Sequence, residues 1–459
     1  DLTCLFLSNA RASPTLTREK QPILKVAVAV PVSQAFDYLP PEGAPAPQPG
    51  CRVRVPFGAR RAVGLIVGQA TESDLAADRI RRCSAVLDER PLLGPDDLEL
   101  IRFTSDYYHH PVGEVVSTAL PALLRKGKGL HPVVEALVAT GAAATTDIDA
   151  LARRAPKQAE LLETVCDAGG NGIEANELTE LLPNWRRTAK GLLEKGLLER
   201  IELRAPDFDE TIAPDATPGP ELNDDQEAAL ATLRRHDGFG VCLLDGVTGS
   251  GKTEVYLTRM RDVIASGRQV LVLVPEIGLT PQIVARLRKR LGIEPALLHS
   301  GLGDAQRLAA WRAARAGAAK LVVGTRSAIF TPLANPGLII VDEEHDHSFK
   351  QQEGLRYSAR DLAIVRAKLL DIPVVLGTAT PTLEMLHHCH SGNYVHVRLP
   401  RRAGGAQPPG LRLVDTLRAP ATDGISEPLA AAIKRHLDHE GQVLLFLNRR
   451  GFAPTLICA

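Results

Sequence analysis

The sequence predicts a multidomain protein. A small β-barrel-like domain and a winged helix precede a Rossmann-like α/β domain in the C-terminal half. Short alternating β patterns separated by Pro and Gly begin at Ile23. After residue 222, six continuous apolar runs alternate with helical segments, as buried parallel strands require. A length of 459 residues exceeds one ordinary core and therefore favours several domains.

Composition narrows the class of protein. The 54 Lys and Arg balance the 54 Asp and Glu, so net charge gives no support for a nucleic-acid partner, and local patches must supply it. The seven cysteines are scattered without a CxxC pair, which fits a reducing compartment. No apolar run approaches the ~18 residues that a membrane span needs. We expect a cytoplasmic protein without membrane contact, in which residues 1–22 are a disordered leader.

The N-terminal half divides into two predicted domains and a linker. Residues 23–129 carry the short β runs followed by helices over 96–125, broken at two prolines. Residues 130–204 end in three helical patterns and a strand, the outline of a winged helix that rests on duplex DNA. A three-helix protein-docking module is the alternative. Residues 205–221 are rich in proline and acidic residues and are predicted to be a linker.

The run GVTGSGKT at 246–253 lies between the apolar run VCLLD and a helical pattern. Strand, glycine loop and helix are the context that a P-loop needs, because glycines let successive N–H groups turn toward phosphate oxygens. Lys252 is then expected to reach the β- and γ-phosphates of ATP and Thr253 to hold Mg²⁺. A Gly-rich turn without a ligand is the disfavoured alternative. The predicted ATP-contacting loop comprises Gly246, Val247, Thr248, Gly249, Ser250, Gly251, Lys252 and Thr253.

Two further positions complete the predicted ATP site. The strand GLIIVD ends at Asp342, whose carboxylate is placed to hold the Mg²⁺ shell, and Glu343 is placed to orient the attacking water. A solvated acidic turn is the alternative, which pairing with a P-loop disfavours. Gln226, about 20 residues before the P-loop, is expected to contact an adenine edge with its amide.

Polar loops follow several predicted strands. The segments PEIGLTPQ (275–282), GTRSAIFTP (324–332) and GTATP (377–381) offer hydroxyls, backbone amides and the cation of Arg326. Such mixed surfaces suit the phosphates of a DNA strand. Together with the P-loop and Asp342, this order of motifs is typical of a superfamily 2 helicase lobe.

The order LNDDQ, GVTGSGKTEVY, VPEIGLTPQ, LHSGL, GTRSAIFTP, DEEHDHSFKQQEG, GTATPTLE and FLNRRGFAP resembles the PriA family of bacterial primosomal replication-restart helicases. The resemblance extends to FDYLPPEG, GCRVRVPFG and DYYHHPVGEV, so it covers about residues 23–459. It implies a RecA-like lobe over 222–400 in an ATP-dependent 3′-to-5′ helicase. That helicase would recognise stalled or abandoned forks and single-stranded DNA. The implied partners are single-stranded-DNA-binding protein and other primosome proteins.

The resemblance also implies roles for individual residues. The 3′ end of a nascent strand would be captured by Phe36, Asp37, Tyr38 and Gly58. An aromatic-rich loop over 345–357 would sense single-stranded DNA through Phe349, Lys350, Gln351, Gln352, Arg356 and Tyr357. Coupling between DNA and hydrolysis would pass through His345, Thr378 and Thr380.

The family continues beyond the NRRG segment with cysteines that bind two Zn²⁺ ions and a second lobe that carries an arginine finger. Residues 401–459 are therefore expected to be the start of that region, with Cys458 as the first zinc ligand. One thiolate does not make a zinc site. We expect this chain to bind nucleotide and to hydrolyse it poorly. A fork-binding scaffold without motor activity is the alternative function, and a P-loop enzyme unrelated to nucleic acid is disfavoured.

Overall fold

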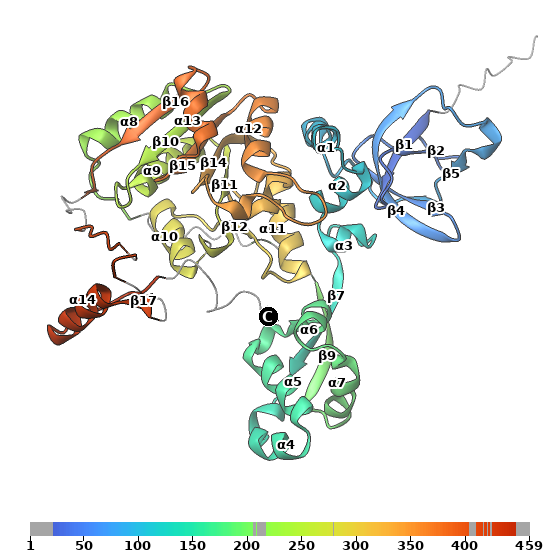
Figure 1. Ribbon diagram of the computed structural model, residues 1–459. Coiled ribbons are helices and arrows are strands. Elements are labelled where there is room, and N and C mark those ends of the chain that lie inside the picture. Colours follow the sequence, from blue (N-terminus) through green and yellow to red (C-terminus); the bar gives the residue numbers. More distant parts are fainter. Residues whose placement is uncertain are drawn as a thin grey trace, which may run out of the picture. The chain divides into compact units, whose positions relative to one another are not determined.

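The computed structural model describes residues 22–204, 208, 217–278, 280–403, 410–415, 417–419, 421–422 and 425–446. Almost all of the predicted leader, most of the predicted linker and Cys458 lie outside these residues. The chain forms two compact units, Asp1–Ala403 and Gly404–Ala459. Figure 1 shows the elements of both.

The first unit begins with a six-stranded sheet of order β5-β2-β1-β4-β3-β6 (Figure 1). Because side chains alternate between the two faces of a strand, Leu24, Val26 and Val28 of β1 lie on one face and pack in a small hydrophobic core. The predicted closure into a barrel stays a prediction. The strands are β1 (Ile23–Val28), β2 (Phe36–Leu39), β3 (Arg52–Phe57), β4 (Arg60–Ala70), β5 (Arg81–Arg82) and β6 (Ala85–Val86).

Three helices follow this sheet, and they share a hydrophobic core with the C-terminal half of the unit. Two arginines from that half tie the contact together. Arg366 is buried and lies 3.6 Å from Asp97, and Arg315 donates to the carbonyls of Leu92 and Pro91 at 2.9 and 2.6 Å. The helices therefore link the sheet to the lobe. They are α1 (Pro95–Tyr107), α2 (Val112–Ala119) and α3 (Ala122–Arg125).

Residues 133–204 form a separate core around Trp185, with a three-stranded antiparallel sheet of order β8-β7-β9. The three predicted helices and the terminal strand are present. Strand β7 lies where no element was predicted, and the winged-helix assignment stays a prediction. The elements are β7 (Val133–Ala139), α4 (Ile148–Arg154), α5 (Pro156–Asp167), β8 (Ile173–Glu174), α6 (Ala175–Leu181), α7 (Trp185–Glu194) and β9 (Leu198–Arg204).

The C-terminal part of the first unit is a parallel sheet of seven strands, β12-β13-β11-β14-β15-β10-β16, with helices on both faces (Figure 1). All six predicted strands are present, and β16 was missed. The strands are β10 (Gly240–Gly246), β11 (Gln269–Leu273), β12 (Ala296–Leu298), β13 (Leu321–Gly324), β14 (Pro336–Asp342), β15 (Pro373–Thr378) and β16 (Val395–Leu399).

Alternating residues of the central strands feed two cores. In β11, Leu271 and Leu273 pack with α11, α12 and α13, while Val270 and Val272 pack with α8, α9 and α10. This two-sided burial explains why the strands are continuously apolar. The helices are α8 (Asp224–Arg234), α9 (Lys252–Ala265), α10 (Pro281–Leu291), α11 (Asp304–Ala316), α12 (Ala359–Leu369) and α13 (Leu383–His390).

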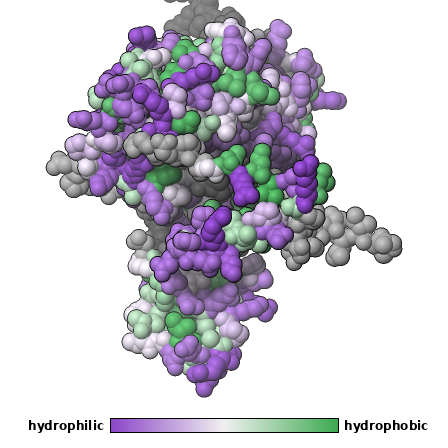
Figure 2. All heavy atoms as spheres, turned by 60° about the vertical axis from the view of Figure 1, so that its left-hand side comes forward, coloured by the Kyte–Doolittle hydropathy of each residue, from purple (hydrophilic) through white to green (hydrophobic). Residues whose placement is uncertain are grey.

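The second unit contains the short hairpin of β17 (Ala421–Thr422) and β18 (Ile425–Ser426), followed by α14 (Glu427–Asp438). Residues 443–446 have no regular secondary structure, and Leu444 and Phe446 are exposed. Within the described residues, no helix is long and apolar enough to cross a membrane. Hydrophilic side chains cover most of the face shown in Figure 2, with smaller hydrophobic patches between them.

Burial lowers the reactivity expected of two cysteines. It raises the pKa of both Cys83 and Cys242 to about 11. Because only the thiolate is alkylated, we expect both to react at pH 8 roughly 100-fold more slowly than a free cysteine. Peptide mapping after timed iodoacetamide treatment measures these rates, with the half-buried Cys166 as the internal comparison. Modification of Cys83 and Cys242 as fast as Cys166 in the folded protein would contradict this burial.

Candidate nucleotide site and DNA-contacting loops

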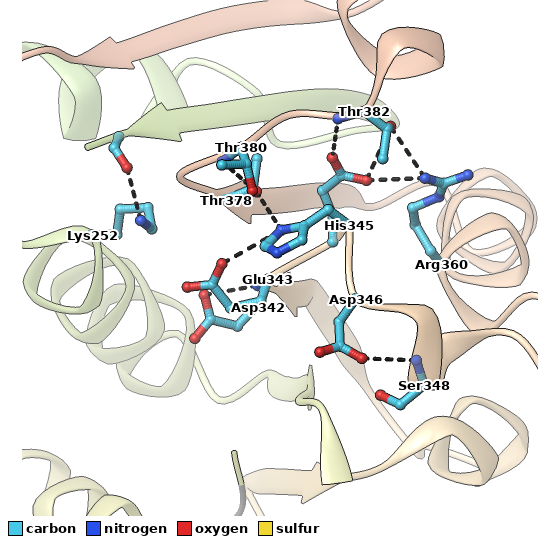
Figure 3. Close-up of polar contacts among 12 residues, drawn as sticks. Lys252, Asp342, Glu343, His345, Asp346, Ser348, Arg360, Thr378, Thr380 and Thr382 are labelled. Atoms are coloured by element: carbon cyan, nitrogen blue, oxygen red, sulfur yellow. Dashed lines mark hydrogen bonds and ion pairs between the residues drawn. The ribbon is translucent and has the colours of Figure 1, made fainter. Parts of the chain in front are cut away.

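The predicted P-loop joins β10 to α9. Gly249 and Gly251 have φ values of 79° and 83°, a backbone region that glycine adopts without strain. A Cβ on Gly246 would lie 2.5 Å from Ser250 Oγ, so this position also needs glycine. Lys252 Nζ donates to the Gly246 carbonyl at 2.8 Å, which places the ammonium over the loop (Figure 3). The loop therefore has the curled form expected of a phosphate cradle.

Gln226 supports this loop. Its Nε2 donates to the Ser250 carbonyl at 2.9 Å, and its Oε1 accepts from the backbone N–H of Asn223 at 3.0 Å. The side chain is buried, and Asn223 Oδ1 accepts in return from the backbone N–H of Gln226 in a capping box. Gln226 thus links the start of α8 to the P-loop, a role that the sequence did not reveal. Its contact with adenine stays a prediction.

Two glycines of the loop give a matched pair of variants. A Cβ on Gly251 would overlap Gln226 Nε2, whereas a Cβ on Gly249 meets nothing within 4 Å. Both have positive φ, so both alanine variants carry backbone strain of about 1–3 kcal/mol. We expect Gly251→Ala to weaken nucleotide binding and lower the unfolding midpoint more than Gly249→Ala, because only it displaces Gln226. Thermal melting with and without nucleotide measures both effects, and equal losses would contradict the role of Gln226.

Asp342 ends β14, which pairs with β15. Strand β15 pairs in turn with β10, the strand that leads into the P-loop. Its Oδ1 accepts from Tyr256 Oη at 3.2 Å and from the backbone N–H of Glu343 at 3.1 Å. Burial and the nearby Glu343 charge raise the pKa of Asp342. A Cβ on Gly377 in β15 would overlap Tyr256 Oη, so glycine there makes room for this hydrogen bond. Tyr256 and Gly377 therefore orient the predicted metal-binding carboxylate, and neither was assigned that role from sequence.

Glu343 adopts the left-handed region with φ of 50° and is half-buried. His345 Nδ1 lies 3.6 Å from Glu343 Oε2 and 2.7 Å from Thr378 Oγ1, which in turn accepts from the backbone N–H of Thr380 at 3.0 Å (Figure 3). The three residues predicted to couple DNA to hydrolysis thus lie together at the end of β15, next to Glu343. The structure brings them together as a chain of polar contacts.

Glu344, which has no role assigned from the sequence, connects the acidic turn to two neighbouring segments. Its side chain is buried, forms an ion pair with Arg360 at 3.0 Å and accepts from the backbone N–H of Thr382 at 2.9 Å. Its own backbone N–H donates to the Gly377 carbonyl at 2.9 Å. The acidic turn, α12 and the loop after β15 are therefore fixed to one another. The only signal in the sequence was a second Glu directly after the predicted catalytic one.

The residues of the P-loop fit a nucleotide phosphate. Ser250 Oγ is buried and has no hydrogen-bond partner among the described residues, and the cradle has glycine where a Cβ would fill it. Asp342 and Thr253 supply the oxygen donors that Mg²⁺ prefers. For zinc, the described part of the chain contains no group of three or more His, Cys, Asp or Glu able to hold a metal. The expected first zinc ligand, Cys458, lies outside the described residues.

The aromatic-rich loop differs from expectation. Phe349 and Tyr357 were expected to contact DNA, but they are 2% and 0% exposed. Tyr357 packs edge-on against Phe330, with ring centroids 5.3 Å apart. Both rings therefore belong to the core of the lobe and are not placed to stack on a base. Lys350 and Arg356 are exposed, and their DNA contacts stay a prediction.

The residues predicted to capture the 3′ end also differ in burial and in their contacts. Tyr38 is buried at 5% exposure, and its hydroxyl donates to the Pro56 carbonyl at 3.0 Å, so its ring is not exposed to a DNA end in this conformation. Asp37 lies 2.7 Å from Lys25 Nζ and accepts from Ser73 Oγ at 2.5 Å. Half-buried Phe36 and exposed Gly58, with φ of 59°, stay available for the predicted contact.

Arg326 follows Thr325, the first residue after β13, in one of the predicted DNA-contacting loops. It is half-buried, and one terminal nitrogen donates to the Ser348 carbonyl at 3.1 Å. The loop after β13 is thereby joined to the aromatic-rich loop. Arg326 therefore links the two segments expected to contact DNA.

Comparison with known proteins places these features in a family. Residues 25–121 match the family model of the 3′DNA-binding domain (3′BD) of PriA, and residues 223–388 match that of the DEAD/DEAH box helicase. The replication restart protein PriA of Haemophilus influenzae is 41% identical over 445 residues, which is 95% of this chain and 60% of that protein. The chain belongs to the PriA family. PriA of Bacillus subtilis is 33% identical over 497 residues, covering 93% of this chain and 62% of the relative.

The chain spans about 60% of the length of these PriA relatives. The solved structure of RecG bound to a three-way DNA junction covers 49% of the chain and 29% of RecG, at 21% identity and a TM-score of 0.35, and this partial overlap adds nothing to the assignment. The 3′DNA-binding match ends at residue 121, at the start of α3. The PriA-type 3′DNA-binding region therefore includes α1 and α2, the helices that pack on the lobe.

Proposed function

We propose that the chain is the fork-recognising and nucleotide-binding part of an ATP-dependent 3′-to-5′ DNA helicase. This helicase would act at stalled or abandoned replication forks and initiate primosome assembly for replication restart. The observation that carries the proposal is the contact chain from Glu343, the predicted catalytic carboxylate, through His345 to Thr378 at the end of β15. Family membership supports the same function.

The residues divide the chemistry among them. Lys252 would hold the β- and γ-phosphates, and Thr253 with Asp342 would hold Mg²⁺. When bound, Mg²⁺ neutralises the negative charge that develops on the phosphates. Glu343 would orient and activate the attacking water, and its left-handed backbone turns it away from the strand direction. Tyr256 keeps Asp342 pointed toward the loop through its hydrogen bond.

A DNA signal would reach this site over a short route. His345 contacts Thr378 at 2.7 Å and lies 3.6 Å from the Glu343 carboxylate. A shift of the Thr378 side chain at the end of β15 on DNA binding would therefore move the imidazole and, with it, the carboxylate that orients water. The buried Glu344–Arg360 pair holds the rest of the turn, so the movement is confined to these side chains.

The N-terminal sheet would supply fork recognition. Phe36 would stack on the terminal base, Gly58 would permit close approach of a strand, and Asp37 would accept a hydrogen bond from the 3′ end after leaving Lys25 or Ser73. Single-stranded-DNA-binding protein and the primosome proteins are the proposed partners of the assembled machine.

The effect of DNA binding on nucleotide affinity tests the proposal. We expect a forked DNA to tighten binding of a non-hydrolysable ATP analogue about 5- to 150-fold, the usual range of coupling between two sites. Fluorescence titration of a labelled analogue, with and without fork, measures it. Fork binding with no effect on nucleotide affinity would contradict the motor and favour the fork-binding scaffold. Absence of both binding activities would contradict the proposal altogether.

End capture has its own test. We expect a fork whose nascent strand ends in a 3′-hydroxyl to bind more tightly than one ending in a 3′-phosphate, and Asp37→Ala to abolish the difference. Glu42→Ala, which removes a carboxylate from the turn after β2, is the matched control. Equal affinity of the wild-type chain for both forks would remove the end-capture role.

A further inference from the structure

Tyr108 joins the 3′DNA-binding region to the C-terminal lobe through two contacts. It directly follows α1, the helix that lies against α12 (Figure 1). Its hydroxyl accepts a hydrogen bond from the backbone N–H of Ser358 at 3.1 Å. The Lys350 ammonium lies over its ring, with Nζ 5.1 Å from the ring centroid, which is a cation–π distance. One side chain of the N-terminal region therefore contacts two points of the lobe.

These two points are the two ends of one loop. Lys350 and Ser358 pair as an isolated antiparallel bridge, and the backbone N–H of Gln351 donates to the Tyr357 carbonyl at 3.0 Å. Ser358 is buried, so its backbone N–H needs an acceptor from the protein. The Tyr108 hydroxyl supplies that acceptor. The base of this loop is therefore held by the 3′DNA-binding region as well as by the lobe.

Ser358 also begins α12, the helix that fixes the acidic turn. Its Oγ caps the first turn of the helix by accepting a backbone N–H at 3.3 Å. Arg360, two residues later, pairs with the buried Glu344, the residue next to Glu343. One hydrogen bond, the first turn of a helix and one ion pair thus separate Tyr108 from the acidic turn. Tyr108 therefore helps to set the position of the helix end that carries this ion pair.

On its other side, Tyr108 is connected to the strands that carry the residues predicted to capture the 3′ end. The next residue, His109, has φ of 50°, in the turn that leads into α2. A Cβ on Gly113 of α2 would lie 1.7 Å from the Val28 carbonyl oxygen, so α2 and the end of β1 are in direct contact. Strand β1 pairs with β2, which carries Asp37. Packed elements therefore connect the predicted 3′-end site to Tyr108.

We propose that Tyr108 is a positioning residue through which capture of a nascent 3′ end tightens nucleotide binding by the lobe. A DNA end held by β2 would restrict the motion of β1, α2 and Tyr108. Through Ser358 it would then restrict the end of α12 that holds the acidic turn. A site that is already ordered loses less conformational entropy when it binds a second ligand. The inference rests on the proposed function, since it names the route by which end capture acts on the nucleotide.

Nucleotide affinity at saturating fork tests the inference, with a fluorescent non-hydrolysable ATP analogue as probe. In the wild-type chain, we expect a fork with a nascent 3′-hydroxyl strand to tighten binding of the analogue about fivefold more than the same fork without a nascent strand, the lower end of the usual coupling range. Tyr108→Phe keeps the ring and loses the hydroxyl, and it should bring the two affinities within about twofold of each other. Its affinity for the analogue without DNA, and for each fork without the analogue, should stay unchanged. A general loss of packing would lower these affinities as well.

Tyr107→Phe is the matched control, because Tyr107 is the preceding residue, undergoes the same change and is 65% exposed. It should keep the wild-type difference between the two forks. Hydrogen exchange of the Ser358 amide gives a second readout that needs no variant. In the wild-type chain, the fork with the nascent strand should slow this exchange more than the fork without it. Melting curves verify that both variants are folded.

The outcomes separate the inference from the proposed function. If the two forks differed as much in Tyr108→Phe as in Tyr107→Phe, the inference would be overturned and the proposed function would stand. Exchange at Ser358 that does not respond to the nascent strand would have the same meaning. If neither fork changed nucleotide affinity in the wild-type chain, the motor itself would be contradicted, and the inference with it.

Discussion

Replacing Lys252 with alanine is expected to weaken ATP binding by roughly 10- to 150-fold. A hydrogen bond to a charged group contributes about 1.5–3 kcal/mol, which is the free energy that this change removes. The ammonium lies over the P-loop, 2.8 Å from the Gly246 carbonyl, so it is already positioned for the phosphates. Isothermal titration with ATP and Mg²⁺ measures the loss.

Arg261→Ala is the matched control for this variant. Arg261 is an exposed cation of the same helix, α9, and it donates to the Arg290 carbonyl at 3.2 Å, away from the loop. It removes the same charge from the same element and should leave the dissociation constant within about twofold. An unchanged affinity in Lys252→Ala would mean that the P-loop does not hold the nucleotide as proposed.

The elements around the ATP site could be predicted because their signals are local. Continuous apolar runs predicted all six strands they were assigned to, and the glycine pattern predicted the loop that Gly249 and Gly251 form. Strand β16 was missed because Val395, Val397 and Leu399 alternate with polar residues in an edge strand, and this pattern is less distinctive than a buried run.

The contacts that orient the site could not be predicted, since they join residues distant in sequence. Tyr256 reaches Asp342 only because Gly377 leaves room in the strand between them. The burial of Phe349 and Tyr357 likewise depends on how the loop folds back onto Phe330. An aromatic-rich loop reads the same in sequence whether its rings face solvent or core, so the sequence could not test the DNA contacts that the family resemblance implied.

The packing of α1–α3 on the C-terminal lobe could not be predicted for the same reason, because it joins residues that are distant in sequence. Helix α2 contacts β1 and β4 of the N-terminal sheet. From more than 200 residues away, Arg366 also pairs with Asp97 of α1, and Arg315 binds the carbonyls of Pro91 and Leu92 just before α1. Amphipathic spacing identifies an apolar face but not the surface that covers it. This packing brings the 3′DNA-binding region and the region that matches the DEAD/DEAH box helicase model into one compact unit.

Arg360→Ala is expected to destabilise the first unit by about 3–5 kcal/mol, the usual cost of removing one partner of a buried ion pair. Glu344 has a fully buried side chain, and Arg360 lies 3.0 Å from it and is itself only 18% exposed. Without the guanidinium, the carboxylate keeps the Thr382 N–H and hydroxyl but loses its countercharge. The turn that carries Glu343 should loosen as a result. Chemical denaturation followed by circular dichroism measures the shift in midpoint.

Arg356→Ala provides the comparison, because Arg356 is an exposed arginine four residues earlier. Its removal should change stability by less than about 0.5 kcal/mol. A double variant, Glu344→Gln with Arg360→Ala, separates the lost pair from the buried charge. It should recover part of the stability, since a neutral amide costs less to bury than an unpaired carboxylate. If Arg360→Ala were as stable as Arg356→Ala, the pair would not hold the acidic turn, and the confinement of movement to His345 and Glu343 would lose its physical basis.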